Sequence, residues 1–135
     1  MNSFERRVGP AGGAKICHKD LVKYTVQYSE HDTRTIEIPW FVGGVKSAQI
    51  GYTSEIMVAS AGRAKKFEDI DDATAYDFDS RSVLLNEREI GIVRNQDVCV
   101  LVQLLEAKSG PSYGSQDYFV KFKFEVRPLD FTSCC

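Results

Sequence analysis

Residues 118–127 alternate between apolar and charged side chains, and this pattern limits the possible folds more than any other part of the sequence. Every second residue from Tyr118 to Val126 is apolar, and every second residue from Lys121 to Arg127 is charged. Phe119 is the one apolar residue on the charged side. Successive side chains of an extended strand point to opposite faces. We therefore expect a β-strand with one face in the core and the other in solvent.

The same alternation predicts a hairpin in the first third of the chain. Residues 22–29 and 36–42 place apolar side chains at every second position, and the polar residues 30–33 between them suit a tight turn. Pro39 lies in the second of these strands and has no backbone N–H, which favours an edge strand or a bulge. Residues 48–59 keep the alternation and predict one further strand, with Gly51 as a bulge.

The second half of the chain predicts a central strand and a second hairpin. Residues 97–106 contain a continuous apolar run, which suits a strand covered on both faces. Residues 82–85 and 89–93 flank a short polar turn and predict a small hairpin. A short helix fits residues 66–75. These elements predict a mainly β fold of six to seven strands with at most one or two short helices, arranged as an antiparallel β-sandwich or a partly open barrel. An α+β sheet is the alternative.

Three parts of the chain differ in composition. Residues 1–15 contain three glycines and a proline and predict a flexible N-terminal arm without secondary structure. Residues 16–131 form a single predicted β-rich domain, which fits the length of 135 residues. Residues 132–135 are a predicted C-terminal tail.

The overall charge argues against several classes of partner. A net charge of −2 gives the chain no general attraction to nucleic acid or to an anionic membrane, and no reason to expect a basic patch. No apolar run approaches the roughly 18 residues of a membrane span. The N-terminus also lacks the apolar stretch of a secretory signal. We therefore expect a cytoplasmic protein that binds neither nucleic acid nor membrane.

The thiols and histidines give no catalytic pattern. Cys17 and His18 are adjacent, so on an extended strand their side chains point in opposite directions and cannot act on each other. Cys99 lies in an apolar run and is expected to be a small core residue. The glycines of residues 9–15 do not have the spacing of a phosphate-binding loop. No cofactor is expected.

The acidic segment at residues 68–79 allows two interpretations in which it binds something: a calcium ion or a basic partner surface. Calcium takes six to eight oxygen ligands, so Asp69, Asp71, Asp77 and Asp79 are an alternative calcium site, although no EF-hand spacing is present. Asp69, Asp71 and Asp72 are our candidates for a docking patch that meets a basic surface of a partner. A solvated acidic surface without a ligand is the simplest interpretation.

Three aromatic residues are candidates for a binding face. Phe41 and Phe119 occupy the solvent-facing parity of their predicted strands, and Tyr113 lies in the glycine-rich loop 108–116. Exposed aromatic side chains mark binding surfaces when a second layer does not cover them.

These observations favour a non-enzymatic function. We expect a β-domain that binds another protein or associates with itself, of the kind seen among small microbial accessory, immunity-type or virion-associated proteins. The alternative is a β-barrel that binds a small ligand or catalyses a reaction with carboxylates in a pocket.

Overall fold

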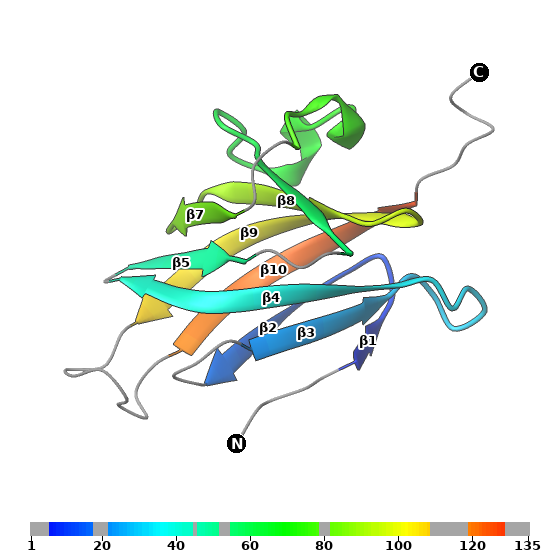
Figure 1. Cartoon of the computed structure of the whole chain (residues 1–135), viewed down its shortest axis with the longest axis horizontal. Coiled ribbons are helices and arrows are strands. Elements are labelled where there is room, and N and C mark those ends of the chain that lie inside the picture. The colour runs from blue at the N-terminus through cyan, green and yellow to red at the C-terminus, as the bar shows by residue number, and fades with distance from the viewer. Residues whose placement is uncertain are drawn as a thin grey trace.

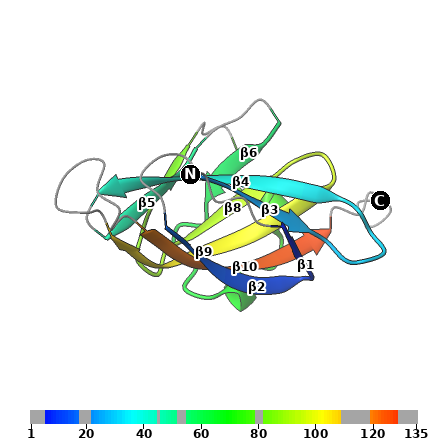
Figure 2. The same ribbon diagram turned by 90° about the horizontal axis from the view of Figure 1, so that it is seen from below.

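The computed structural model describes residues 6–17, 22–44, 46–51, 55–78, 82–108 and 119–128. These residues form two β-sheets, which overlap in Figure 1 and are seen as two layers in Figure 2. In spatial order, the first sheet contains β1 (Arg6–Val8), β3 (Val22–Gln27), β4 (Thr35–Gly44), β5 (Ser47–Ile50) and β7 (Val83–Asn86). The second contains β2 (Ala11–Cys17), β10 (Phe119–Pro128), β9 (Val98–Lys108), β8 (Ile90–Arg94) and β6 (Met57–Ser60).

The predicted mainly β fold is confirmed, and the two sheets form a sandwich that does not close into a barrel. All strand pairs are antiparallel except β1 with β3. The sandwich has ten strands instead of six to seven, because β1 and β2 were not expected and residues 48–59 form two strands. Within the described residues the helical segments are two single turns of 3-10 helix, η1 (Phe67–Asp69) and η2 (Ala73–Ala75).

The predicted alternation of β10 is confirmed by its packing. Phe122 places its ring centroid 5.0 Å from that of Trp40 on β4 and 5.1 Å from that of Tyr24 on β3. Phe124 lies 6.0 Å from Tyr24, and all four side chains are at most 2% exposed. Aromatic rings bury about 150–250 Å² each, so this group supplies much of the contact between the sheets.

The predicted central strand is also confirmed. β9 lies between β10 and β8, and its first seven residues are all buried. Val100 and Val102 point into the space between the sheets, whereas Cys99 and Leu101 belong to a second apolar cluster on the outer face of the second sheet. β9 is therefore covered on both faces.

The prediction of an arm without secondary structure is wrong for residues 6–15, which contain β1 and most of β2. Glycine is depleted in strands, which explains the error. Here Gly12 lies opposite Phe124, and a Cβ atom at Gly12 would come within 3.0 Å of the Phe124 ring. The missing side chain thus makes room for a core aromatic ring beneath β2.

Two predicted pairings are wrong because the chain crosses between the sheets. Residues 48–59 were expected to form one strand, but β5 belongs to the first sheet and β6 to the second. Residues 82–93 were expected to form a hairpin, but β7 pairs with β5 and β8 pairs with β9. β5, β6 and β7 each direct apolar residues into the space between the sheets, whereas β8 directs Val93 there and Ile90 and Ile92 to the outer face. Apolar positions of this kind fit a strand of either sheet, so they do not reveal the change of sheet.

Pro39 predicted a strand that lies at an edge or is bulged. β4 is not an edge strand, because it lies between β3 and β5, but it is bulged, with a register shift between Val42 and Gly44. The proline sits where the neighbouring β5 ends. Its carbonyl accepts a hydrogen bond of 2.8 Å from the N–H of Gly51, the first residue after β5. The absent N–H therefore costs only one hydrogen bond at the end of a ladder.

Residues 61–78, called the covering segment below, lie over the outer face of β8 and β9 as the green coil of Figure 1. Arg127 of β10 holds this segment by donating a hydrogen bond of 3.0 Å to the carbonyl of Phe67 and another to the carbonyl of Ile70. Gln103 of β9 is 5% exposed and donates a 2.9 Å hydrogen bond to the carbonyl of Lys65. Two side chains of the second sheet therefore hold the covering segment in place by hydrogen bonds to its backbone carbonyls.

We predict that Arg127→Ala loosens the covering segment. Hydrogen bonds to a charged group contribute about 1.5–3 kcal/mol, so the segment should open more often while the sandwich stays folded. Trypsin cleavage after Arg63, Lys65 or Lys66 measures this opening, and we expect it to be faster than in the parent protein. Lys121→Ala, on the same strand and face, is the control and should not change the rate. Equal cleavage of both variants would contradict the anchoring role.

Candidate functional site

Three lysines gather on the outer face of the second sheet, beside the covering segment. Lys121 and Lys123 project outward because the alternation of β10 directs its apolar residues into the core. Lys15 of β2 lies in register with Lys121 on the same face, and all three side chains are exposed. We call Lys15, Lys121 and Lys123 the lysine face. A local basic surface therefore exists although the net charge of the chain is −2.

The register of β2 and β10 places two of these lysines, Lys15 and Lys121, directly opposite each other. The N–H of Val126 donates a hydrogen bond to the carbonyl of Pro10, so these two residues are a hydrogen-bonded pair. In an antiparallel ladder, hydrogen-bonded and non-hydrogen-bonded pairs alternate. By this alternation Lys15 and Lys121 are a non-hydrogen-bonded pair. In such pairs the Cα atoms are about 4.5 Å apart and the side chains are close neighbours. Like charges directly opposite each other destabilise a sheet. This pair is therefore unfavourable for folding.

A hollow of about 450 Å³ lies among the lysines. It is lined by the three lysines together with Gly12, Gly13, Ala14, Leu105 and Phe122. Gly13 lies opposite Lys123, and a Cβ atom at Gly13 would approach the carbonyl oxygen of Phe122 to 2.8 Å. Because Gly13 has no side chain, the surface between Lys15 and Lys123 remains open. The hollow thus combines small and apolar residues with a cationic rim.

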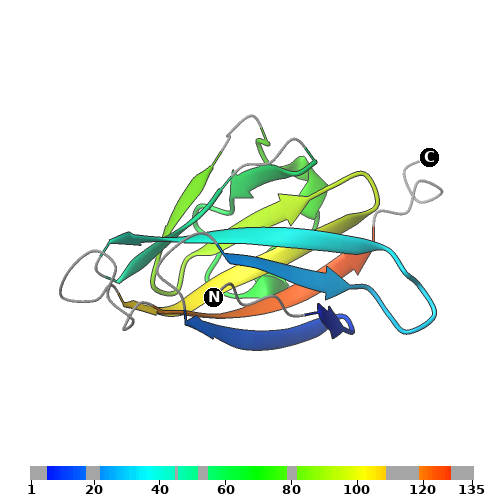
Figure 3. The same cartoon turned by 60° about the horizontal axis from the view of Figure 1, so that its bottom comes forward.

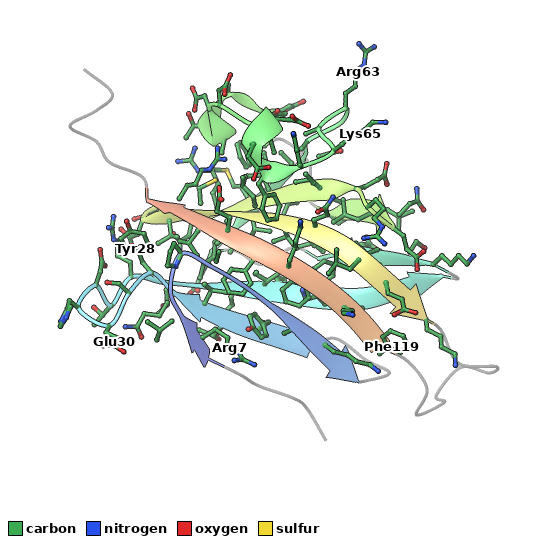
Figure 4. The ribbon with its side chains drawn as sticks, turned by 180° about the vertical axis from the view of Figure 1, so that it is seen from behind. Arg7, Tyr28, Glu30, Arg63, Lys65 and Phe119 are labelled. Carbon is green, nitrogen blue, oxygen red and sulfur yellow. The ribbon has the colours of Figure 1, made fainter. Side chains whose placement is uncertain are left out.

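Phe119, one of the three aromatic candidates, belongs to this face. It begins β10, is half-buried, and its ring lies 4.3 Å from the Nζ atom of Lys15. Figure 4 shows Phe119 at the start of β10, beside the end of β2. Phe119 therefore contacts Lys15, a residue of the segment predicted to be a flexible arm.

A second hollow, of about 440 Å³, continues the first at Leu105 and Lys121. Its other lining residues are Lys46, Glu87, Arg88 and Glu106. Lys46 and Arg88 have φ angles of 62° and 79°, a left-handed conformation that is uncommon for residues other than glycine. Such backbone strain is frequent at functional sites. Both strained residues contribute a cation to the same hollow.

The acidic segment is not assembled as a metal site in the described residues. The carboxylate of Asp69 accepts hydrogen bonds from the N–H groups of Lys65 and Lys66, and that of Asp72 accepts from Thr74. These bonds lower the pKa of both carboxyls. Over the described ranges, no group of three or more His, Cys, Asp or Glu side chains is placed to hold a metal ion.

The other acidic candidates are exposed on the surface or lie outside the described residues. Asp71 and Asp77 are exposed, and Asp79 falls outside the described residues. The calcium alternative therefore has no converging ligands among the residues that can be placed. Asp69, Asp71 and Asp72 are all exposed beside η1 and η2, so they remain accessible as a surface patch.

The remaining candidates can be placed only in part. The backbone of Phe41 lies in β4, but its side chain falls outside the described residues, as does the whole of Tyr113. The same holds for the side chain of Cys17 and for His18. Cys99 is the predicted core residue, 1% exposed, and burial raises the pKa of its thiol to about 11.

Comparison of the chain with protein-family models, with curated proteins and with solved structures found no match. In the part of the chain that the structure describes, no helix has the length and apolar character needed to cross a membrane. The geometry of the two hollows and the lysine face is therefore the basis for any functional conclusion.

We predict that the Cys99 thiol is inert in the folded protein. Its raised pKa keeps it protonated at pH 8, and only the thiolate is a good nucleophile. In a variant with Cys17, Cys134 and Cys135 changed to serine, a thiol reagent at pH 8 should modify Cys99 only after denaturation. The free energy of unfolding should also fall between pH 9 and pH 11, where the unfolded chain releases this proton and the folded chain retains it. Rapid labelling without denaturant would contradict this assignment.

Proposed function

We propose that this protein is a non-enzymatic protein-binding domain whose lysine face takes an acidic segment of a partner. The observation that carries the proposal is the pairing of Lys15 with Lys121 on adjacent strands. A like-charge pair of this kind reduces stability, and departures from local rules concentrate at functional sites. A carboxylate of a partner placed between the two ammonium groups would remove the repulsion.

The surroundings of the lysine face favour a protein partner over a nucleic acid. Leu105 lines both hollows. Glu106 of β9 lies in register with Lys121, so Lys121 has Glu106 on one neighbouring strand and Lys15 on the other. A phosphate backbone would meet this carboxylate unfavourably, whereas a peptide can place an apolar residue at Leu105 and a basic one at Glu106. Apolar centres with polar rims are typical of protein interfaces. The cytoplasmic location inferred from the sequence stays part of this proposal.

The second hollow supports the alternative of a small-ligand or carboxylate-based site. Glu87 and Glu106 both line it, and Glu87 accepts a hydrogen bond of 3.3 Å from the N–H of Ala107. Lys46, Arg88 and Lys121 line the same hollow. Pockets for small ligands are lined mainly by apolar side chains, whereas Leu105 is the one apolar residue that lines this hollow. We therefore rank this alternative below protein binding.

We predict that Lys15→Gln and Lys121→Gln each weaken binding of a fluorescent hexaglutamate peptide. Loss of one exposed ion pair should reduce affinity about two- to fivefold, measured by fluorescence anisotropy at low salt. Removal of the like-charge pair should raise the free energy of unfolding of Lys121→Gln by about 0.5 kcal/mol, measured by urea denaturation, whereas Lys15→Gln should gain less because it also loses the contact with Phe119. Lys65→Gln is the control, because Lys65 projects from the covering segment (Figure 4).

Three outcomes would contradict the proposal. Equal affinity of the parent protein and both lysine-face variants would remove the face as the site. An oligothymidylate of similar length that binds more tightly than the peptide, and depends on the same lysines, would replace the protein partner by a nucleic acid. A small ligand that binds through Glu87 would favour the alternative function.

A further inference from the structure

We propose that β2 pairs edge to edge with β2 of a second copy, so that two sandwiches share one continuous antiparallel sheet. β2 is the outermost strand of the second sheet, and no described strand pairs with its outer side (Figure 3). It is seven residues long, whereas the other edge strands contain three or four residues. β2 also lines the first hollow, but the pairing uses the free backbone groups of its edge and does not rest on the function proposed above.

The hydrogen-bond pattern identifies the free groups. Pro10 forms a hydrogen-bonded pair with Val126 of β10, and such pairs recur at every second residue. Gly12 and Ala14 are therefore also hydrogen-bonded to β10. The backbone N–H and C=O groups of Ala11, Gly13, Lys15 and Cys17 consequently point away from β10. An edge of this kind is a template for another strand, and proteins commonly block it with proline, bulges or charged side chains, especially lysine. β2 contains no proline and its register with β10 shows no bulge, and Lys15, its one charged residue, projects from the outer face.

A second copy fits this edge because one register satisfies both hydrogen bonding and charge. In an antiparallel pair related by a two-fold axis through Ala14, Gly13 of one copy lies opposite Lys15 of the other, and Ala11 lies opposite Cys17. All four outward residues of each strand then exchange hydrogen bonds. Each lysine faces a glycine, so the register avoids placing two lysines directly opposite each other.

Pairing in this register would join the two lysine faces on one side of the shared sheet. Each copy brings the same positive surface to the junction, so the faces repel each other at low ionic strength. Salt screens such repulsion. The dimer should therefore become tighter as salt is added, whereas binding of an acidic peptide to the lysine face should become weaker. Salt thus separates this inference from the proposed function.

A cysteine at Ala14 tests the register. In the proposed pair the two Ala14 Cα atoms are about 4.5 Å apart, within the range of a disulfide. Ala14→Cys, in a background with Cys17, Cys134 and Cys135 changed to serine, should form a disulfide-linked dimer under mild oxidation. Ala11→Cys is the control, because the two copies of residue 11 lie at opposite ends of the pair. We expect cross-linking of Ala14→Cys to be roughly tenfold faster or more. Equal rates would overturn the register.

A second pair of variants tests the dimer without a cross-link. Lys15→Pro removes an N–H that points to the free edge and leaves the ladder with β10 intact, whereas Lys15→Ala keeps this N–H. By light scattering, we expect the parent protein and Lys15→Ala to be dimers in moderate salt and Lys15→Pro to be a monomer with an unchanged circular dichroism spectrum. A monomeric parent protein at all salt concentrations would overturn the proposal. Peptide binding by that monomer would leave the function of the lysine face intact.

Discussion

The packing of Phe122 and Phe124 between the two sheets is the constraint on which the rest of the structure depends. These rings contact Tyr24, and Phe122 also contacts Trp40, so the aromatic residues of one strand connect β10 to β3 and β4. Because side chains of a strand alternate, burial of the rings directs Lys121 and Lys123 to the opposite face. The Phe124 ring also requires the space left by Gly12. The core therefore determines both the position of the lysine face and the small side chains of the neighbouring edge strand.

The elements that were predicted correctly are those whose pattern is local. The alternation of β3, β4 and β10 and the buried run of β9 are each readable within a strand of at most eleven residues. β2 was missed because Gly12 and Gly13 resemble a linker, and only the Phe124 ring explains the first of them. The crossings after β5 and β7 were not predicted because apolar positions in a short strand fit either sheet.

The candidate site was predictable only in part for the same reason. The outward parity of Lys121, Lys123 and Phe119 is evident from the sequence, but the partner of Lys121 on β2 is more than 100 positions earlier in the chain. Pairing and register are tertiary information, so a like-charge pair across two strands leaves no local pattern. The acidic segment was the clearest charged feature of the sequence, yet Asp69 and Asp72 accept hydrogen bonds from the backbone of their own turns.

The central claim is that the lysine face is the binding surface, and residue-resolved NMR tests it most directly. Titration of ¹⁵N-labelled protein with hexaglutamate peptide would show which backbone amides change. The account predicts the largest shifts at Lys15, Lys121 and Lys123, with neighbouring changes at Leu105. Shifts confined to the covering segment or to the turn between β3 and β4, or no shifts at millimolar peptide, would contradict it.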